Sequence, residues 1–136
     1  MIQVIAGKKG SGKTKRLIDM TNATAKNADT NVIFIDKDTS YTREIDHAVR
    51  FINASDYGVS GGEMLLGFLC GILGSNYDIG TIYIDAFKKL YADDLNGSEQ
   101  FFVQLEKLSS ENNVNFVLSV SEDPALLPAF INTFIA

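Results

Sequence analysis

Gly7-Lys8-Lys9-Gly10-Ser11-Gly12-Lys13-Thr14 is the stretch that decides the fold, and it matches the pattern G-x-x-x-x-G-K-[ST] at every position. It follows an apolar run at residues 2–6 that predicts a buried strand. It precedes residues 13–27, whose apolar side chains have helical spacing. Glycines allow a tight loop with inward-pointing backbone amides, and the N-terminus of the following helix adds partial positive charge. The unit is therefore expected to bind phosphate groups.

The side chains of this loop suit a nucleoside triphosphate with Mg²⁺. Lys13 can reach the β- and γ-phosphates as a mobile positive charge, and the Thr14 hydroxyl can ligate Mg²⁺. The alternative is a chance glycine-rich turn between a strand and a helix. The predicted nucleotide-binding residues are Gly7, Lys8, Lys9, Gly10, Ser11, Gly12, Lys13, Thr14 and Lys15.

A second motif, Thr81-Ile82-Tyr83-Ile84-Asp85, is a short apolar strand that ends in a carboxylate. In open parallel sheets ligands bind at the carboxyl ends of the strands, so Asp85 is expected beside the phosphates. There it can hold Mg²⁺ through a bound water, which makes Thr14 and Asp85 the predicted metal residues and Lys13 and Asp85 the predicted catalytic ones. The alternative is that Asp85 only caps a helix over residues 86–91.

These two motifs resemble the Walker A and Walker B motifs of the P-loop NTPase superfamily. The resemblance is specific at residues 2–18 and extends to residues 81–85. It implies ATP or GTP as ligand and Mg²⁺ as cofactor. The layout also looks like that of short clostridial P-loop proteins, some of them labelled twitching-motility ATPases. Motors with that label carry a separate N-terminal domain and His-rich motifs, whereas this sequence has one histidine.

The remaining sequence alternates between apolar runs and helical patterns, as parallel sheets covered on both faces do. We therefore expect an α/β, three-layer P-loop fold with a mostly parallel sheet of about five strands and a RecA-like minimal core. It is expected to form a single nucleotide-binding domain over residues 1–136. The predicted strands are residues 2–6, 31–36, 49–54, 81–85 and 114–120. The predicted helices are residues 13–27, a buried helix opened by a Ser60 cap, and residues 98–112, while the tail at 130–135 fits a strand or a docked helix.

The predicted activity is ATP binding with slow Mg²⁺-dependent hydrolysis. RecA-like ATPases carry a polar residue near the end of a further strand, and Ser119 or Ser121 matches that position. The class also has a Glu after or near its Walker B Asp to orient the attacking water, but Ala86 follows Asp85 here. Three residues could substitute for this Glu: Glu63, Glu122 and Asp123.

Other functions remain open from the sequence. Without useful turnover the protein would be a nucleotide-dependent switch or scaffold, with residues 37–59 as the moving part. Lys37-Asp38-Thr39 resembles a segment of the thymidine kinase family, which implies a nucleoside or nucleotide kinase. Ser60-Gly61-Gly62-Glu63 resembles the signature of ABC ATPases, although a simple helix N-cap is the plainer interpretation. If hydrolysis needs an arginine finger, Arg43 or Arg50 of a neighbouring molecule could supply it.

Composition limits the partners and the compartment. The net charge of −5 makes nucleic acid an unlikely partner, and five of the twelve basic residues lie within residues 8–16. A single cysteine, Cys70, excludes a disulfide framework and fits a reducing compartment. The longest apolar run, Met64–Leu73, is about half a membrane span, so a cytoplasmic protein without a membrane span is expected. A protein partner is unknown, and self-association through Gly67 and Gly71 is possible.

Overall fold

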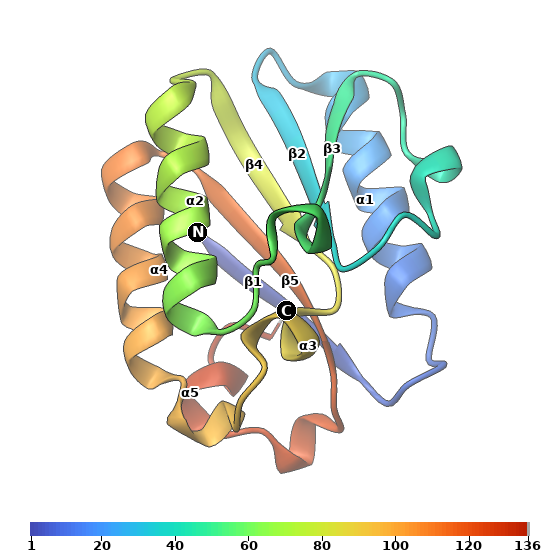
Figure 1. The fold of residues 1–136 in the computed structure, drawn as a ribbon. Helices are drawn as coiled ribbons and strands as arrows, with labels where there is room; N and C mark the ends of the chain where they lie inside the picture. Colours follow the sequence, from blue (N-terminus) through green and yellow to red (C-terminus); the bar gives the residue numbers. More distant parts are fainter. Residues whose placement is uncertain (136) are drawn as a thin grey trace.

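A computed structural model describes residues 1–135 of the chain. Its centre is a five-stranded, entirely parallel sheet with the strand order β1-β5-β4-β2-β3 (Figure 1). The strands are β1 (Ile2–Gly7), β2 (Asn31–Asp36), β3 (Val49–Asn53), β4 (Ile79–Ile84) and β5 (Asn115–Ser121). The helices are α1 (Lys13–Asn27), α2 (Gly62–Ser75), α3 (Phe87–Tyr91), α4 (Glu99–Asn112) and α5 (Ala129–Asn132). Four 3₁₀ turns cover Thr42–Glu44, Ala54–Tyr57, Leu95–Gly97 and Pro124–Leu126.

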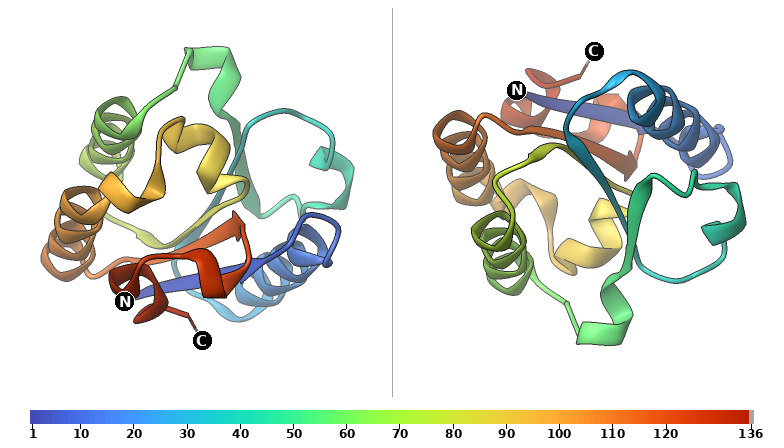
Figure 2. Two further views of the ribbon diagram at one scale, coloured as in Figure 1. Left: turned by 90° about the horizontal axis from the view of Figure 1, so that it is seen from below. Right: turned by 90° about the horizontal axis from the view of Figure 1, so that it is seen from above.

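Helices cover both faces of the sheet, which confirms the predicted α/β layering. Helix α1 lies on one face, while α2 and α4 lie side by side on the other (Figures 1 and 2). Residues 32–36 of β2 and 116–120 of β5 are all buried, as expected of strands with a layer on each face. Because all the strands are parallel, their carboxyl ends lie together at one end of the sheet.

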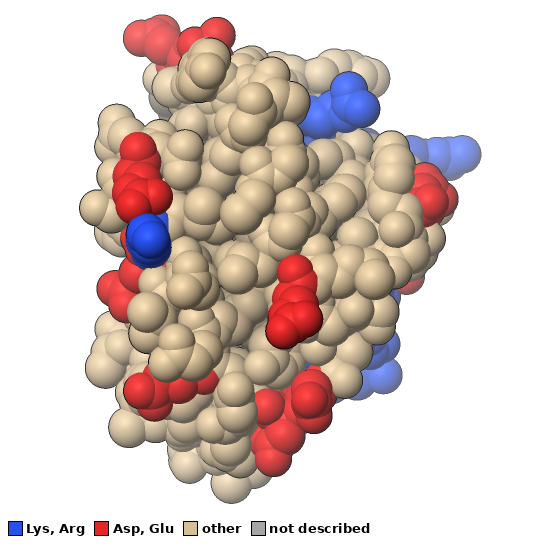
Figure 3. All heavy atoms as spheres, turned by 60° about the vertical axis from the view of Figure 1, so that its left-hand side comes forward, with Lys and Arg blue, Asp and Glu red and all other residues tan. Residues whose placement is uncertain are grey.

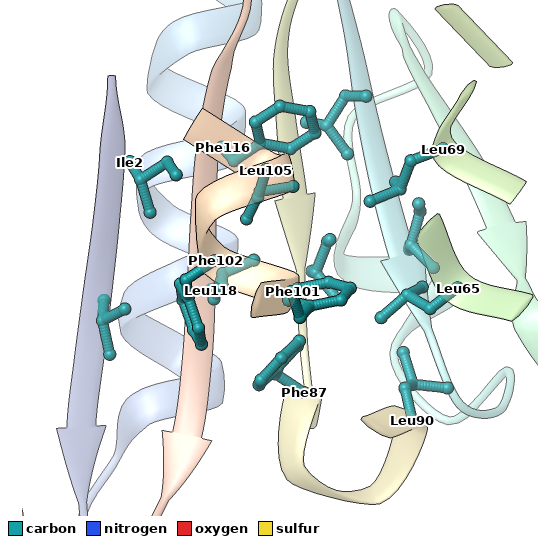
Figure 4. Packing of buried hydrophobic residues seen from close by; sticks show 14 of the residues in the cluster. Ile2, Leu65, Leu69, Phe87, Leu90, Phe101, Phe102, Leu105, Phe116 and Leu118 are labelled. Carbon is teal, nitrogen blue, oxygen red and sulfur yellow. The ribbon is translucent and has the colours of Figure 1, made fainter. Parts of the chain in front are cut away.

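The larger core lies between the sheet and α2, α3 and α4 (Figure 4). Phe101, Phe102 and Leu105 of α4 point toward Phe116 and Leu118 of β5. Phe87 of α3 is fully buried against Phe101 and Phe102, with ring centroids 5.3 and 5.6 Å apart. This packing holds α3 directly behind the carboxyl end of β4, where Asp85 follows the strand.

A smaller core lies between the sheet and α1. Leu17 and Ile18 of the helix pack with Val32 and Phe34 of β2. Ile45, from the irregular stretch after β2, belongs to the same cluster. The side chain of Asn22 fixes this stretch to α1, because its amide nitrogen donates to the Glu44 carbonyl and its amide oxygen accepts from the Asp46 backbone N–H.

Two local predictions need correction. Helix α2 does not begin with a Ser60 cap: its first residue is Gly62, its N-cap is Gly61, and no side chain caps it. The tail is neither a full strand nor one docked helix. It forms the single turn α5 and then a parallel bridge from Ile135 to Val4 at the free edge of β1. The predicted ends of β2 are confirmed, and those of the other strands differ from the observed ones by at most two residues.

The surface formed by α2 and α4 carries scattered acidic side chains and wide uncharged areas (Figure 3). None of the helices among residues 1–135 is long and apolar enough to cross a membrane.

Candidate functional site

The glycine loop, residues 7–12, connects the carboxyl end of β1 to the first turn of α1. Gly10 and Gly12 have φ values of +83° and +86°, a conformation in which any other residue is strained. At Gly7 a Cβ would lie 2.6 Å from Oγ of Ser11, so the Ser11 hydroxyl would have to rotate away. The positive φ values of Gly10 and Gly12 therefore give the strongest local reason for glycine in this loop.

Lys13 lies folded back over this loop. Its Nζ donates to the Lys8 carbonyl at 2.9 Å and to Oγ of Ser11 at 3.4 Å, and the residue is 8% exposed. Burial lowers the pKa of the Lys13 ammonium, while the charge of Asp85 opposes that change. The ammonium thus lies inside the loop, held by contacts that an anionic ligand can replace.

Thr14 and Asp85 come together from distant parts of the sequence. The Thr14 hydroxyl donates to Oδ2 of Asp85 at 3.1 Å, and the two residues are 71 positions apart. Asp85 is buried and also accepts a hydrogen bond at Oδ1 from the Ser119 hydroxyl. The interpretation of Asp85 as a helix cap is wrong, because the N-cap of α3 is Ala86 and no side chain caps that helix.

Ser119, not Ser121, reaches the site from β5. Strand β5 lies between β1 and β4, so its carboxyl end separates the glycine loop from Asp85. Ser119 is 2% exposed, and its hydroxyl also accepts the backbone N–H of Ala86 at 2.9 Å. Ser121 is exposed at the end of the strand, in register with Gly7.

Sequence reasoning missed one residue of this site, Asp36. It is the last residue of β2, fully buried, and directly beside Asp85, since Ile35 pairs with Ile84 one position earlier. Its Oδ1 accepts the Lys37 backbone N–H at 2.7 Å, and its Oδ2 has no hydrogen-bond partner. The signal was present in the sequence: residues 31–36 are an apolar strand that ends in Asp, the same pattern that identified Asp85.

The two carboxylates affect each other. Burial raises the pKa of Asp36 to about 6, and the negative charge of Asp85 adds to that rise. Asp38, two residues later, has its pKa lowered to about 2 by the Ser40 backbone N–H and the Lys37 ammonium. These two acids thus have opposite environments: Asp36 is buried beside another negative charge, whereas Asp38 has hydrogen-bond donors and a paired lysine.

The donor set fits Mg²⁺, which prefers carboxylate, hydroxyl and water oxygens. Asp36 contributes an unpartnered buried oxygen, and Asp85 a buried carboxylate. The Thr14 hydroxyl keeps its lone pairs while it donates its proton to Asp85. No group of three or more His, Cys, Asp or Glu side chains that could hold a metal occurs among residues 1–135, so water or phosphate oxygens would have to complete the coordination.

The other predicted loop lysines point to solvent. Lys8 and Lys9 are exposed, and Lys15 forms an exposed pair with Asp19 at 3.1 Å along α1. None of the three side chains forms a hydrogen bond or ion pair with a buried site residue. Lys13 is therefore the one lysine of the predicted set whose side chain lies within the loop.

The three acids proposed to replace the missing Glu differ in position. Glu122 forms a backbone bridge with Gly7, and its carboxylate pairs with Lys88 at 3.0 Å. Asp123 caps the turn at Pro124–Leu126 through the Ala125 N–H. Glu63 lies exposed in the first turn of α2. Of these, only Glu122 lies beside the glycine loop, and its carboxylate is already engaged.

The segments behind the alternative functions have local structural roles. A Cβ on Gly62 would lie 2.6 Å from Cε1 of Tyr91, and the Gly61 N–H donates to the Leu90 carbonyl. The Ser-Gly-Gly turn thus packs against α3. Lys37 and Asp38 pair with each other at 2.9 Å.

Neither arginine proposed as a finger reaches the site within the molecule. Arg43 is exposed in the stretch after β2. Arg50 lines a groove near the amino ends of β2 and β4, together with residues such as Asn31, Asn76 and Ile79. This is the end of the sheet opposite the glycine loop. A finger supplied by another molecule stays a prediction.

The sequence matched no protein family and no curated protein in comparisons with both. The function is therefore inferred from the geometry of the site.

Proposed function

We propose that the protein binds a nucleoside triphosphate with Mg²⁺ and hydrolyses it slowly. One observation carries this proposal: the Thr14 hydroxyl, at the start of the helix after the glycine loop, contacts the Asp85 carboxylate at the end of β4. A lysine inside a glycine loop, a hydroxyl and a carboxylate are the parts that phosphate and Mg²⁺ binding require. They come from two separate stretches of sequence, residues 7–14 and 81–85, so a chance match of either motif alone does not explain their meeting.

Each residue has a distinct task in this proposal. Lys13 leaves the Lys8 carbonyl and Ser11 hydroxyl and moves to the terminal phosphates, where its charge is best compensated. Backbone amides of the glycine loop and of the first turn of α1 hold the phosphate oxygens. Thr14 and Asp85 would hold Mg²⁺, which would neutralise charge that develops on the phosphates.

Turnover is expected to be slow because no free carboxylate among residues 1–135 lies where it could orient the attacking water. Ala86 occupies the position after Asp85, so no carboxylate there orients water. Its backbone lies in the left-handed region at φ +55°, and its N–H is bound to Ser119, which fixes this corner. The neighbouring Glu122 is tied to Lys88. The same features favour a nucleotide-dependent switch as the second candidate, since a switch needs binding without efficient turnover.

The proposal is tested by thermal unfolding with Mg²⁺ and ATP, GTP, ADP or buffer. A ligand at 100 times its dissociation constant stabilises the folded state by about 2.7 kcal/mol, which gives a clear rise in Tm. Lys13→Ala should abolish the rise. Lys26→Ala, a change to an exposed lysine in the last turn of the same helix, should keep it. If no nucleotide raises the Tm of the wild type, the proposal is wrong for this chain.

Phosphate release then separates the two candidates. Turnover above the background of Lys13→Ala supports hydrolysis, and nucleotide binding without such turnover supports the switch. The panel of nucleotides also decides between adenine and guanine.

A further inference from the structure

We propose that Asp36, Asp85 and Thr14 form a divalent-cation site that binds Mg²⁺ or Mn²⁺ before any nucleotide arrives. The inference shares its residues with the proposed function but does not need nucleotide binding to be correct. It makes Asp36 a metal-binding residue, a role that the loop and strand motifs do not assign.

The Asp36 carboxylate is buried without a partner for one of its oxygens. The residue is 0% exposed, and its Oδ2 has neither a hydrogen-bond donor nor contact with solvent. An ionised oxygen buried without a partner loses its hydration and gains nothing in return. Among residues 1–135, Oδ2 of Asp36 is the only buried side-chain oxygen or nitrogen left in this state. A bound cation supplies the missing partner.

The two acids lie on the same face of the sheet. Phe34 and Tyr83 belong to the core beneath α1, while Ile35 and Ile84 belong to the core on the other side. Successive side chains of a strand alternate between faces, so the residue after Ile35 and the residue after Ile84 both point to the side of α1. These residues are Asp36 and Asp85, which are neighbours across the sheet.

Thr14 supplies the third ligand from the first turn of α1, on this same side. Its hydroxyl proton goes to Oδ2 of Asp85, which directs its lone pairs elsewhere. Ser119 binds the other oxygen of Asp85 and so fixes the orientation of that carboxylate. Mg²⁺ usually keeps several waters and is held by one or two carboxylates together with substrate phosphates. Here Asp36, Asp85 and Thr14 supply the protein ligands, and further waters would take the places of the phosphate oxygens.

Within residues 1–135, neither acid is paired with a lysine or an arginine, although the charges of Lys13 and Lys37 act on them from a distance. Three ion pairs occur in the described part of the chain, and none includes Asp36 or Asp85. The Lys13 ammonium is bound to the Lys8 carbonyl and Ser11, and the Lys37 ammonium is bound to Asp38. Two buried carboxylates thus lie side by side while the nearest lysines bind other groups, so a divalent cation has the strongest electrostatic reason to bind between them.

The test uses nucleotide-free protein, stripped with EDTA, and two direct readouts. Loss of the free Mn²⁺ signal in electron paramagnetic resonance measures binding of about one ion per chain. Thermal unfolding with MgCl₂, against KCl of equal ionic strength, should show a rise in Tm on the order of 5 °C when free Mg²⁺ is about ten times its dissociation constant. Asp36→Asn should weaken Mn²⁺ binding on the order of tenfold or more, which is the lower range for lost support of a metal site.

Two variants make the result specific. Asp29→Asn removes a negative charge from an exposed position just before the same strand, β2, and should bind Mn²⁺ as the wild type does. Lys13→Ala should also keep Mn²⁺ binding, because its role is toward phosphate. Circular dichroism verifies that each variant is folded. Equal Mn²⁺ affinities for wild type and Asp36→Asn would overturn the proposal, as would a loss of affinity in Asp29→Asn of the same size as in Asp36→Asn.

The results also separate this inference from the proposed function. If Mn²⁺ binds only when ATP is present, the nucleotide site stands and the independent metal site is wrong. If Mn²⁺ binds alone and no nucleotide raises the Tm further, the metal site stands and nucleotide binding is wrong. If Asp36→Asn binds Mn²⁺ normally but loses phosphate release, Asp36 acts on the water and the metal role is overturned.

Discussion

Ser119 donates a hydrogen bond from its hydroxyl to Oδ1 of Asp85, across the neighbouring strands β5 and β4. The same hydroxyl accepts the N–H of Ala86, so one buried side chain fixes both the carboxylate and the start of α3. The position of Asp85 therefore depends on β5 as well as on its own strand.

Replacing this hydroxyl should lower both stability and ligand affinity. Ser119→Ala leaves the Asp85 oxygen and the Ala86 N–H without their partner, and a lost buried partner costs about 1–3 kcal/mol. Urea unfolding measures this loss, and the Tm rise with Mg²⁺ and nucleotide should shrink in parallel. Ser121→Ala, an exposed serine two residues along β5, should change the free energy of unfolding by less than about 0.5 kcal/mol. Equal effects of the two substitutions would contradict the role of Ser119.

The second prediction concerns the pH dependence of stability through Asp36. Its pKa of about 6 in the folded state lies above the ordinary value of 3.8, so the folded protein binds the proton more tightly than the unfolded chain. The stability that this proton contributes is fully present below about pH 4 and is lost as the pH rises through 6. Asp36→Asn cannot ionise, and without metal it should exceed the wild type at pH 7.5 by on the order of 2 kcal/mol.

Urea unfolding in EDTA from pH 4 to pH 7.5 checks this prediction, with the difference between variant and wild type as the quantity of interest. Asp38→Asn should behave in the opposite way. The pKa of Asp38 is lowered to about 2, so its contribution is present above pH 4 and its removal destabilises the protein at neutral pH. An Asp36→Asn variant that is less stable than the wild type at pH 7.5 would show that the carboxylate has a partner in solution.

Sequence patterns predicted the sheet and part of the site because the relevant signals are local. A buried parallel strand is a continuous apolar run, and the glycine loop has a fixed spacing, so β1, β4 and Asp85 could be located from the sequence. Asp36 carries the same local signal as Asp85. Its importance depends on β2 lying next to β4, and strand order results from the packing of the whole chain rather than from any single stretch.

The start of α2 shows why a local signal can fail. Ser60 and Glu63 have the spacing of a capping box, but the helix begins at Gly62. The Gly61 N–H is taken by the Leu90 carbonyl, and Gly62 lies against the ring of Tyr91. These contacts with α3 come from residues about 30 positions later, so tertiary packing decides where the helix starts.

That contact gives a third prediction, based on two glycines of one helix. Gly62→Ala places a Cβ 2.6 Å from the Tyr91 ring, which itself packs between Phe87 and Phe101 and cannot move away freely. We expect a loss of about 1–3 kcal/mol in the free energy of unfolding, the usual range for overpacking. Gly67→Ala, at an exposed position with no atom near its Cβ, should instead raise it by about 0.5–1 kcal/mol through helix propensity. Urea unfolding measures the change in the free energy of unfolding, which should fall for Gly62→Ala and rise for Gly67→Ala. Stabilisation by Gly62→Ala would show that Tyr91 does not hold its position.

The last prediction concerns Ala92, which ends α3 in the left-handed conformation at φ +59°. Its N–H donates to the Lys88 carbonyl, so the backbone is held there although a Cβ makes that conformation unfavourable by roughly 1–2 kcal/mol. Glycine removes this strain from the folded state. It also makes the unfolded chain more flexible, which offsets part of the stabilisation. Ala92→Gly should therefore add about 0.5–1 kcal/mol to the free energy of unfolding. The same chemical change at Ala23, exposed within α1, should remove about 1 kcal/mol, because glycine there only weakens the helix. Urea unfolding at pH 7.5 compares the two, and a loss of stability in both variants would mean that Ala92 does not hold the left-handed conformation in solution.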